Sequence, residues 1–270
     1  MARQPTLVQK RLGNASMGVF DAHAWVEEGD GLMSSARSIR ARWICMRRQI
    51  KTRKTGPQRD EWGSLTGNPR ASVLLLGYAI EMYLKAGLAK WLKHCPEYLL
   101  LGDTRSYGHN YKLLADDLEI DESIAPRALL EFLSKAVTLE ARYPARAEGG
   151  ETAIEAINRR TSNMWGADRF KEMCRLAERL RAHVQRINGD EGNPSSTAIF
   201  NIAPGGYLVF RVGGNLPFRV TARPPNGESW DANDLSTLLQ SIDSIEIKRF
   251  WNQCALYLDD GTRSKLIRPA

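Results

Sequence analysis

Three side chains near the middle of the chain are of the types that could cleave a phosphodiester without a metal ion. Arg105, His109 and Tyr111 form the pattern R-x-x-x-H-x-Y. Cleavage without a metal ion needs a base close to the 2′-hydroxyl and a cation on the scissile phosphate, and histidine and arginine supply these two groups. The pattern therefore makes Arg105, His109 and Tyr111 candidate catalytic residues.

The same segment also has a structural interpretation. Asparagine is favoured just before the first turn of a helix, so His109 or Asn110 would begin a short helix over residues 110–118. In this interpretation His109 marks a helix start. His183 follows Arg179 at the same spacing, but it lies near the end of an amphipathic helix, where a cation suits the helix dipole. We expect His183 to be a surface or helix-terminal residue.

The helix that must position His109 is predicted from Val73 to Lys93. Its apolar residues recur at steps of three and four, and further apolar side chains widen the stripe beyond one face. This pattern is typical of the central helix of a bundle. Glu81 and Lys85 stand on the helix at positions i and i+4, an arrangement that contributes only about 0.2–0.5 kcal/mol on a surface.

The basic charge of the chain is concentrated at its N-terminal end. Residues 1–70 contain 13 of the 38 Lys and Arg but 6 of the 31 Asp and Glu, a net charge of +7, which leaves 25 of each sign in the rest. Apolar residues from Leu32 to Ile50 repeat at helical steps, and the opposite side of this predicted helix is basic. The candidate nucleic-acid-binding residues are Arg37, Arg40, Arg47, Arg48, Lys51, Arg53 and Lys54.

Two interpretations of this basic face remain open. It is either a solvated surface whose arginines pair with acids elsewhere, such as those from Asp116 to Glu122, or a strip that contacts phosphates, since arginine neutralises backbone charge and stacks on bases. We expect a basic arm at residues 1–19, a break in the first helix near residues 28–31, and a long loop from Lys51 to Asn68, where Gly and Pro are frequent.

Three motifs resemble, in order and spacing, those of the HEPN family of small α-helical bundles. They are A-x-E-x-x-L-K-A at residues 79–86, G-H-N-x-x-x-L at 108–114, and a helix ending in R-Y-P at 142–144. The resemblance covers residues 20–188 and suggests a buried contact between Glu81 and Lys85 that orients the turn before His109. From spacing alone, an ordinary surface ion pair remains the alternative. The motif residues are Glu81, Lys85, Gly108, Arg142 and Tyr143.

Many HEPN domains are metal-independent ribonucleases with the motif R-x(4-6)-H, usually paired across a dimer. This chain lacks the motif, because only three residues separate Arg105 from His109. The resemblance therefore implies a non-catalytic or degenerate protein that binds RNA or a nucleotide, as a homodimer or a subunit of a larger complex, in prokaryotic antiviral defence, a toxin–antitoxin pair or an RNA-guided system. The alternatives are an active endoribonuclease that uses Arg105, His109 and Tyr111 or Arg142, and a structural adaptor.

The C-terminal part of the sequence predicts β-structure. After a polar linker at residues 189–196, three β-branched and aromatic runs separated by Pro-Gly-Gly and Gly-Gly-Asn are typical of consecutive hairpins. A short helix is expected from Asp231 to Ile242, and a last hairpin, with strands at 245–251 and 255–258, around Asn252. The sequence thus predicts an α+β fold, with a helical bundle at 20–188 and a small β-rich domain with one helix at 197–270.

Other features argue against several classes of protein. No run of about 18 apolar residues and no hydrophobic signal core are present, so we expect a cytoplasmic protein that neither spans a membrane nor is secreted. The four cysteines stand singly, which argues against a disulfide framework or a zinc site. P-loop, dinucleotide-binding, metalloprotease and hydrolase motifs are missing. We therefore expect neither a cofactor nor a metal ion.

Overall fold

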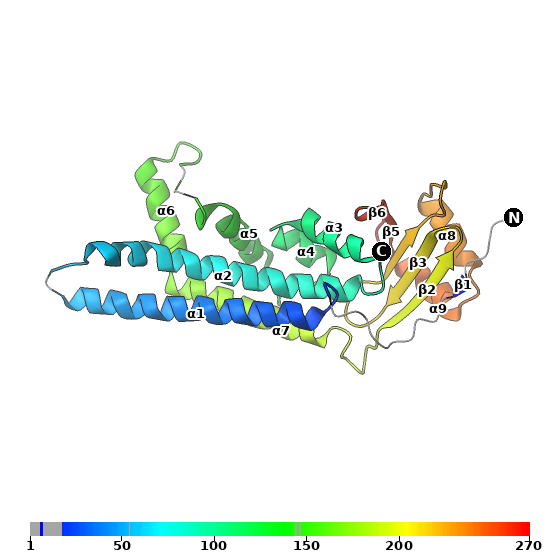
Figure 1. Cartoon of the computed structure of the whole chain (residues 1–270), viewed down its shortest axis with the longest axis horizontal. Coiled ribbons are helices and arrows are strands. Elements are labelled where there is room, and N and C mark those ends of the chain that lie inside the picture. Colours follow the sequence, from blue (N-terminus) through cyan, green and yellow to red (C-terminus); the bar gives the residue numbers. More distant parts are fainter. Residues whose placement is uncertain (1–5, 8–17, 54, 144, 146) are drawn as a thin grey trace.

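The computed structural model describes residues 6–7, 18–53, 55–143, 145 and 147–270. A helical bundle comes first and a mixed β-sheet follows, which confirms the predicted α+β fold. The helices of the bundle are α1 (Ala22–Thr52), α2 (Arg59–Trp91), α3 (Glu97–Tyr107), α4 (Tyr111–Asp117), α5 (Arg127–Lys135), the π-helical turn η1 (Ala136–Glu140), α6 (Ala153–Trp165) and α7 (Ala167–Arg186). Figure 1 shows α1 and α2 as a long antiparallel pair, with the sheet at one end of the bundle.

The first helix, α1, is continuous. Asp21 caps it by accepting hydrogen bonds from the backbone N–H groups of His23 and Ala24 at 2.9 and 3.3 Å. The predicted break at residues 28–31 is wrong, because Gly29 serves close packing: a Cβ there would lie 2.6 Å from Cε1 of Tyr83 on α2. Tyr83 in turn donates a hydrogen bond to Asp30 at 2.8 Å. The glycine thus joins the two long helices.

The second helix, α2, begins at Arg59, so the loop predicted for residues 51–68 is mostly helical. Pro69 lies inside this helix and has no N–H to donate to the Leu65 carbonyl one turn before it. Trp43 of α1 replaces the missing donor, since its Nε1 lies 3.0 Å from the Leu65 oxygen in the buried interface. Packing against α1 therefore completes the hydrogen bonding that the proline interrupts.

The core of the bundle is centred on α2, as the sequence predicted. Val73, Leu76, Ile80 and Leu84 are fully buried, and α1, α7 and η1 pack around the helix. An 18-residue window of α2 is apolar enough by composition to cross a membrane, but 67% of it is buried inside the protein, as is usual for a core helix.

The π-helical turn η1 continues α5 and packs directly on α2. Gly77 of α2 permits this approach, because a Cβ there would lie 2.3 Å from Cγ2 of Val137. The turn ends at Glu140, and Arg142 and Tyr143 follow it. Pro144, which the sequence predicts to end this helix, lies outside the described residues. The packing of η1 on α2 therefore determines where Arg142 lies on the surface of the bundle.

Among the described residues the sheet has six strands in the order β1-β2-β3-β4-β5-β6, antiparallel except between β4 and β5. The hairpins predicted between residues 197 and 222 are confirmed. The last predicted hairpin is wrong: Ile245–Phe250 is a helix that Ser244 caps, and β5 pairs with β4 and β6. The elements are β1 (Thr6–Leu7), β2 (Ser196–Ile202), β3 (Gly206–Val212), β4 (Arg219–Arg223), α8 (Ala232–Ser241), α9 (Ile245–Phe250), η2 (Trp251–Gln253), β5 (Ala255–Asp259) and β6 (Ser264–Arg268).

The sheet is fastened to the end of the bundle by buried polar contacts. Trp91 Nε1 donates to the Pro217 carbonyl at 3.0 Å, and the Ser264 N–H donates to Asp103 Oδ1 at 2.8 Å. The Arg219 guanidinium lies 4.3 Å from the ring centroid of Trp91 and 3.7 Å from that of Tyr257. These contacts join β4, β5 and β6 to α2 and α3.

The contact between Trp43 and Leu65 predicts a specific coupling with Pro69. When Pro69 is present, Trp43→Phe leaves the buried Leu65 carbonyl without a hydrogen-bond donor. In the Pro69→Ala background, the new backbone N–H at position 69 donates to that carbonyl instead. We expect Trp43→Phe to cost about 1–2 kcal/mol more in the wild type than in Pro69→Ala, measured by urea unfolding of the four proteins. Equal costs in both backgrounds would contradict this assignment.

Candidate functional site

The candidate site is built around Glu81, a carboxylate in the middle of α2 that is only 5% exposed. Lys85 Nζ donates to its Oε1 at 2.5 Å, while His109 Nδ1 and the Tyr111 hydroxyl lie 2.8 and 3.2 Å from its Oε2. A buried carboxylate is tolerated only when it is paired and hydrogen-bonded. Glu81 and Lys85 therefore form the buried contact that orients the turn before His109, and the surface-pair alternative is wrong.

The turn before α4 places His109 beside the Glu81 carboxylate. Gly108 has a φ of 52°, in the left-handed region that favours glycine, and Asn110 caps α4 by accepting from the Leu113 N–H at 3.1 Å. The predicted helix start is thus confirmed, and it places the imidazole over Glu81. Both roles that the sequence allowed for His109, a helix-start residue and a member of a polar site, are compatible in this geometry.

The neighbours of His109 select one tautomer of its ring. The Glu81 carboxylate accepts a hydrogen bond, so Nδ1 carries the proton. On the other side, Arg142 Nη2 lies 3.5 Å from Nε2, and a guanidinium can only donate. Both contacts therefore leave Nε2 as the basic nitrogen, on the side of the ring that faces Arg142.

Arg142 stands at the rim of the site. Its Nη2 donates to the Tyr78 hydroxyl, and its guanidinium lies 5.6 Å from the Tyr78 ring centroid. This hydrogen bond raises the pKa of Arg142, which stays a cation. Burial and the nearby Glu81 raise the pKa of Tyr111, which stays a neutral donor. The site therefore has a buried anion below, and an imidazole and a guanidinium above it.

The structure brings together some of the predicted site residues. His109 and Tyr111 meet at Glu81, and the motif residues Lys85 and Arg142 join them. Arg105 does not: it is exposed on α3, and no polar contact joins it to His109 within the described part of the chain. Motif residue Tyr143 is 58% exposed next to Arg142.

Sequence reasoning missed Tyr78 as a member of the site. The signal was its spacing, because Tyr78 precedes Glu81 by three residues and so lies on the same face of α2. Its hydroxyl and ring hold Arg142.

Arg40 of the predicted basic strip lies inside the protein. Arg40 is only 3% exposed, so the prediction that it points outward is wrong. Its guanidinium donates to the carbonyls of Met164, Trp165 and Gly166 at 2.7, 2.8 and 3.0 Å. These carbonyls lie at the end of α6, where the helix leaves acceptors without partners. Burial lowers the pKa of Arg40 to about 10.

The other residues of the strip divide into paired and unpaired groups. The Arg47 guanidinium lies 4.7 and 5.2 Å from the ring centroids of Trp43 and Trp165, and Arg37 pairs with Glu178.

Farther along the strip, Arg53 pairs with Glu61 at 2.7 Å, and Lys54 lies outside the described residues. Arg48 and Lys51 are exposed, without an ion pair to any described residue. Of the acids proposed as partners for the strip, Asp116 pairs with Arg127 and Lys112, and Asp117 accepts a hydrogen bond from Tyr107.

Comparisons with protein-family models, with curated protein sequences and with solved structures find no match to this chain. The HEPN resemblance thus rests on its sequence motifs. In the part of the chain that the structure describes, no group of three or more His, Cys, Asp or Glu side chains is placed to hold a metal ion.

The burial of Glu81 predicts a large effect on stability. Glu81→Ala leaves the Lys85 ammonium buried without its partner, and we expect a loss of about 3–5 kcal/mol in the free energy of unfolding, measured by urea denaturation. The double variant Glu81→Ala/Lys85→Met removes both charges and should recover most of that loss.

An exposed ion pair supplies the matched control. Asp243→Ala breaks the contact with Lys248 on the surface, at 2.7 Å, and should cost less than about 1 kcal/mol. A cost for Glu81→Ala no larger than that for Asp243→Ala would contradict the role assigned to Glu81.

Proposed function

We propose that this chain is a HEPN-like protein that binds RNA or a nucleotide through a phosphate that Arg142 contacts beside His109. The observation that carries the proposal is the convergence of the Arg142 guanidinium and His109 Nε2 at 3.5 Å above the buried carboxylate of Glu81. Arginine offers a planar set of donors that matches phosphate geometry. The imidazole is 28% exposed in its side chain, and Arg142 is exposed, so a ligand reaches both groups.

Cleavage of RNA at the same site is the second candidate, and the contact between Glu81 and His109 favours it. With Nδ1 bound to the carboxylate, Nε2 is free to accept the proton of a 2′-hydroxyl, whose oxygen then attacks the phosphorus to give a cyclic phosphate and a 5′-hydroxyl end. Arg142, in place of Arg105, would contact the scissile phosphate. The leaving oxygen needs a proton, which a second His109 in its doubly protonated form would supply in a homodimer.

Wider features of the proposal come from the HEPN resemblance. It suggests a homodimer or a subunit of a larger complex, in a prokaryotic defence, toxin–antitoxin or RNA-guided system. The exposed Arg48 and Lys51 on α1 would add salt-dependent contacts to an RNA backbone. A structural adaptor remains the alternative if no nucleic acid binds.

Binding of RNA should depend on Arg142 and not on Arg105. A phosphate contact by arginine is worth about 1.5–3 kcal/mol, so we expect Arg142→Gln to weaken binding at least about 10-fold. The measurement is fluorescence anisotropy of labelled RNA, with EDTA present and at several salt concentrations. Arg105→Gln, a change at an exposed arginine outside the site, is the matched control. Equal loss in both variants, or no binding by the wild type, would contradict the proposal.

The same RNA samples test cleavage. If His109 is a base, the wild type shortens the RNA without a metal ion, and His109→Ala slows this by about 10²–10⁴-fold. RNA that is bound and stays intact would support the non-catalytic function. Cleavage that persists in His109→Ala would exclude this residue as the base.

A further inference from the structure

A cavity in two parts lies against α6. The larger part, of about 560 Å³, is also lined by η1, and the smaller part, of about 220 Å³, is also lined by α2. Ala145 and Arg160 line both parts. Small-molecule sites have volumes of roughly 300–1,000 Å³. The larger part has an apolar wall made by Leu139, Tyr143 and Ala156.

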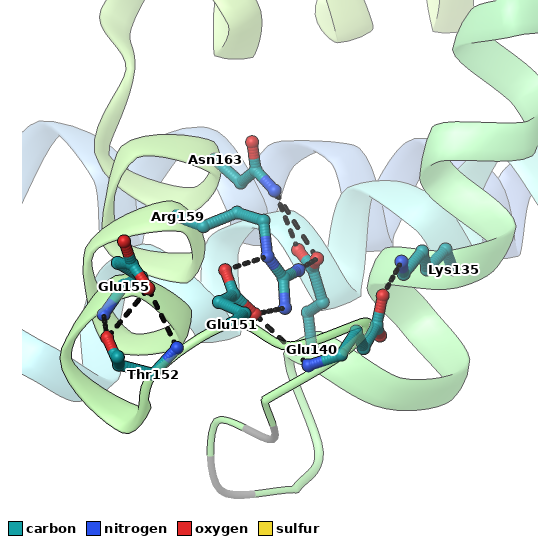
Figure 2. Close-up of polar contacts among 8 residues, drawn as sticks. Lys135, Glu140, Glu151, Thr152, Glu155, Arg159 and Asn163 are labelled. Atoms are coloured by element: carbon teal, nitrogen blue, oxygen red, sulfur yellow. Dashed lines mark hydrogen bonds and ion pairs between the residues drawn. The ribbon is translucent and has the colours of Figure 1, made fainter.

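Most of the charged groups around the larger part neutralise one another. Figure 2 shows the Arg159 guanidinium between two carboxylates, with distances of 2.9 Å to Glu140 and 3.0 Å to Glu151. Glu148 pairs with Lys135 at 2.9 Å. These contacts use up the acidic side chains of the lining.

Arg160 is the exception in this lining. Its Nε is buried and has no hydrogen-bond partner among the described residues, and no ion pair joins its guanidinium to a described carboxylate. Arg70 lines the smaller part of the cavity beside it, and its Nε donates to the Thr66 carbonyl of its own helix. Burial, and then the positive charge of Arg70, lower the pKa of Arg160. Two guanidinium groups thus face one cavity without an anion between them.

We propose that this cavity binds a small organic anion, whose ring lies on the apolar wall of Leu139, Tyr143 and Ala156 and whose phosphate or carboxylate lies between Arg160 and Arg70. The two parts of the cavity match the two parts of such a ligand. A guanidinium with an unused buried N–H gains a partner when the anion enters. The site is separate from that of His109 and Arg142 and does not depend on the function proposed there.

An isolated anion fits this cavity better than a polyanion does. The carboxylates beside the larger part are balanced by Lys135 and Arg159, so among the described lining residues the unbalanced positive charge is confined to Arg160 and Arg70. One anionic group at the end of an apolar body therefore suits both regions.

Isothermal titration calorimetry with four probes tests the proposal. The probes are 2-naphthyl phosphate, 2-naphthoate, 2-naphthol and inorganic phosphate, and the titrations use the Arg142→Gln protein, so that the His109–Arg142 site contributes no binding. We expect one naphthyl anion to bind per chain, and 2-naphthol and inorganic phosphate to bind at least about 10-fold more weakly, because each lacks one half of the ligand. Of 2-naphthyl phosphate and 2-naphthoate, the probe that binds more tightly identifies the anionic group that the cavity takes.

Two variants and one control place the binding in the cavity. Arg160→Gln and Arg70→Gln should each weaken binding of the naphthyl anion at least about 10-fold. Arg48→Gln, at an exposed arginine that lines neither part of the cavity, should not change it. Thermal unfolding checks that each variant is folded. No saturable binding at millimolar probe, or equal binding by Arg160→Gln and Arg48→Gln, would overturn the proposal.

Discussion

The arrangement of the bundle around its candidate site depends on the buried carboxylate of Glu81. A charge in the middle of a core helix is unfavourable unless donors surround it, and here the donors come from α2 itself, from the turn before α4 and from the start of α4. Each of the three donors has a separate role. Lys85 balances the charge, Tyr111 seats α4 on α2, and His109 extends the network outward to Arg142 and the end of η1.

The second constraint is that backbone groups in the long helices need partners. Trp43 supplies a donor to the carbonyl that Pro69 leaves without one, and Arg40 supplies donors to three carbonyls at the end of α6. Both side chains lie on α1, in the segment whose arginines looked like a nucleic-acid strip. Part of the basic charge at the N-terminal end is thus used to join α1 to α2, α6 and α7.

The central helices of the bundle and the hairpins of β2, β3 and β4 could be predicted from periodicity and turn residues, because these signals are local. The continuity of α1 and the early start of α2 could not, since both depend on contacts between helices, of Gly29 with Tyr83 and of Trp43 with Leu65. The parallel pairing of β4 with β5 was missed for the same reason, because α8 and α9 lie between them in sequence.

Within the site, His109, Tyr111 and Glu81 could be named from spacing. Arg142, and not Arg105, lies next to His109, because closeness along the chain does not determine closeness in space.

Glu81 holds His109 with its proton on Nδ1 and leaves Nε2 basic beside Arg142. Nuclear magnetic resonance of the protein with ¹⁵N-labelled histidine tests this directly, through long-range correlations that distinguish the two ring nitrogens, at a mildly alkaline pH where free imidazole is neutral. His109→Gln assigns the signal. We expect the wild type to show a single His109 tautomer, protonated at Nδ1. We expect Glu81→Gln to lose this preference for one tautomer. A ring protonated at Nε2, or the averaged tautomers of free histidine in the wild type, would contradict it.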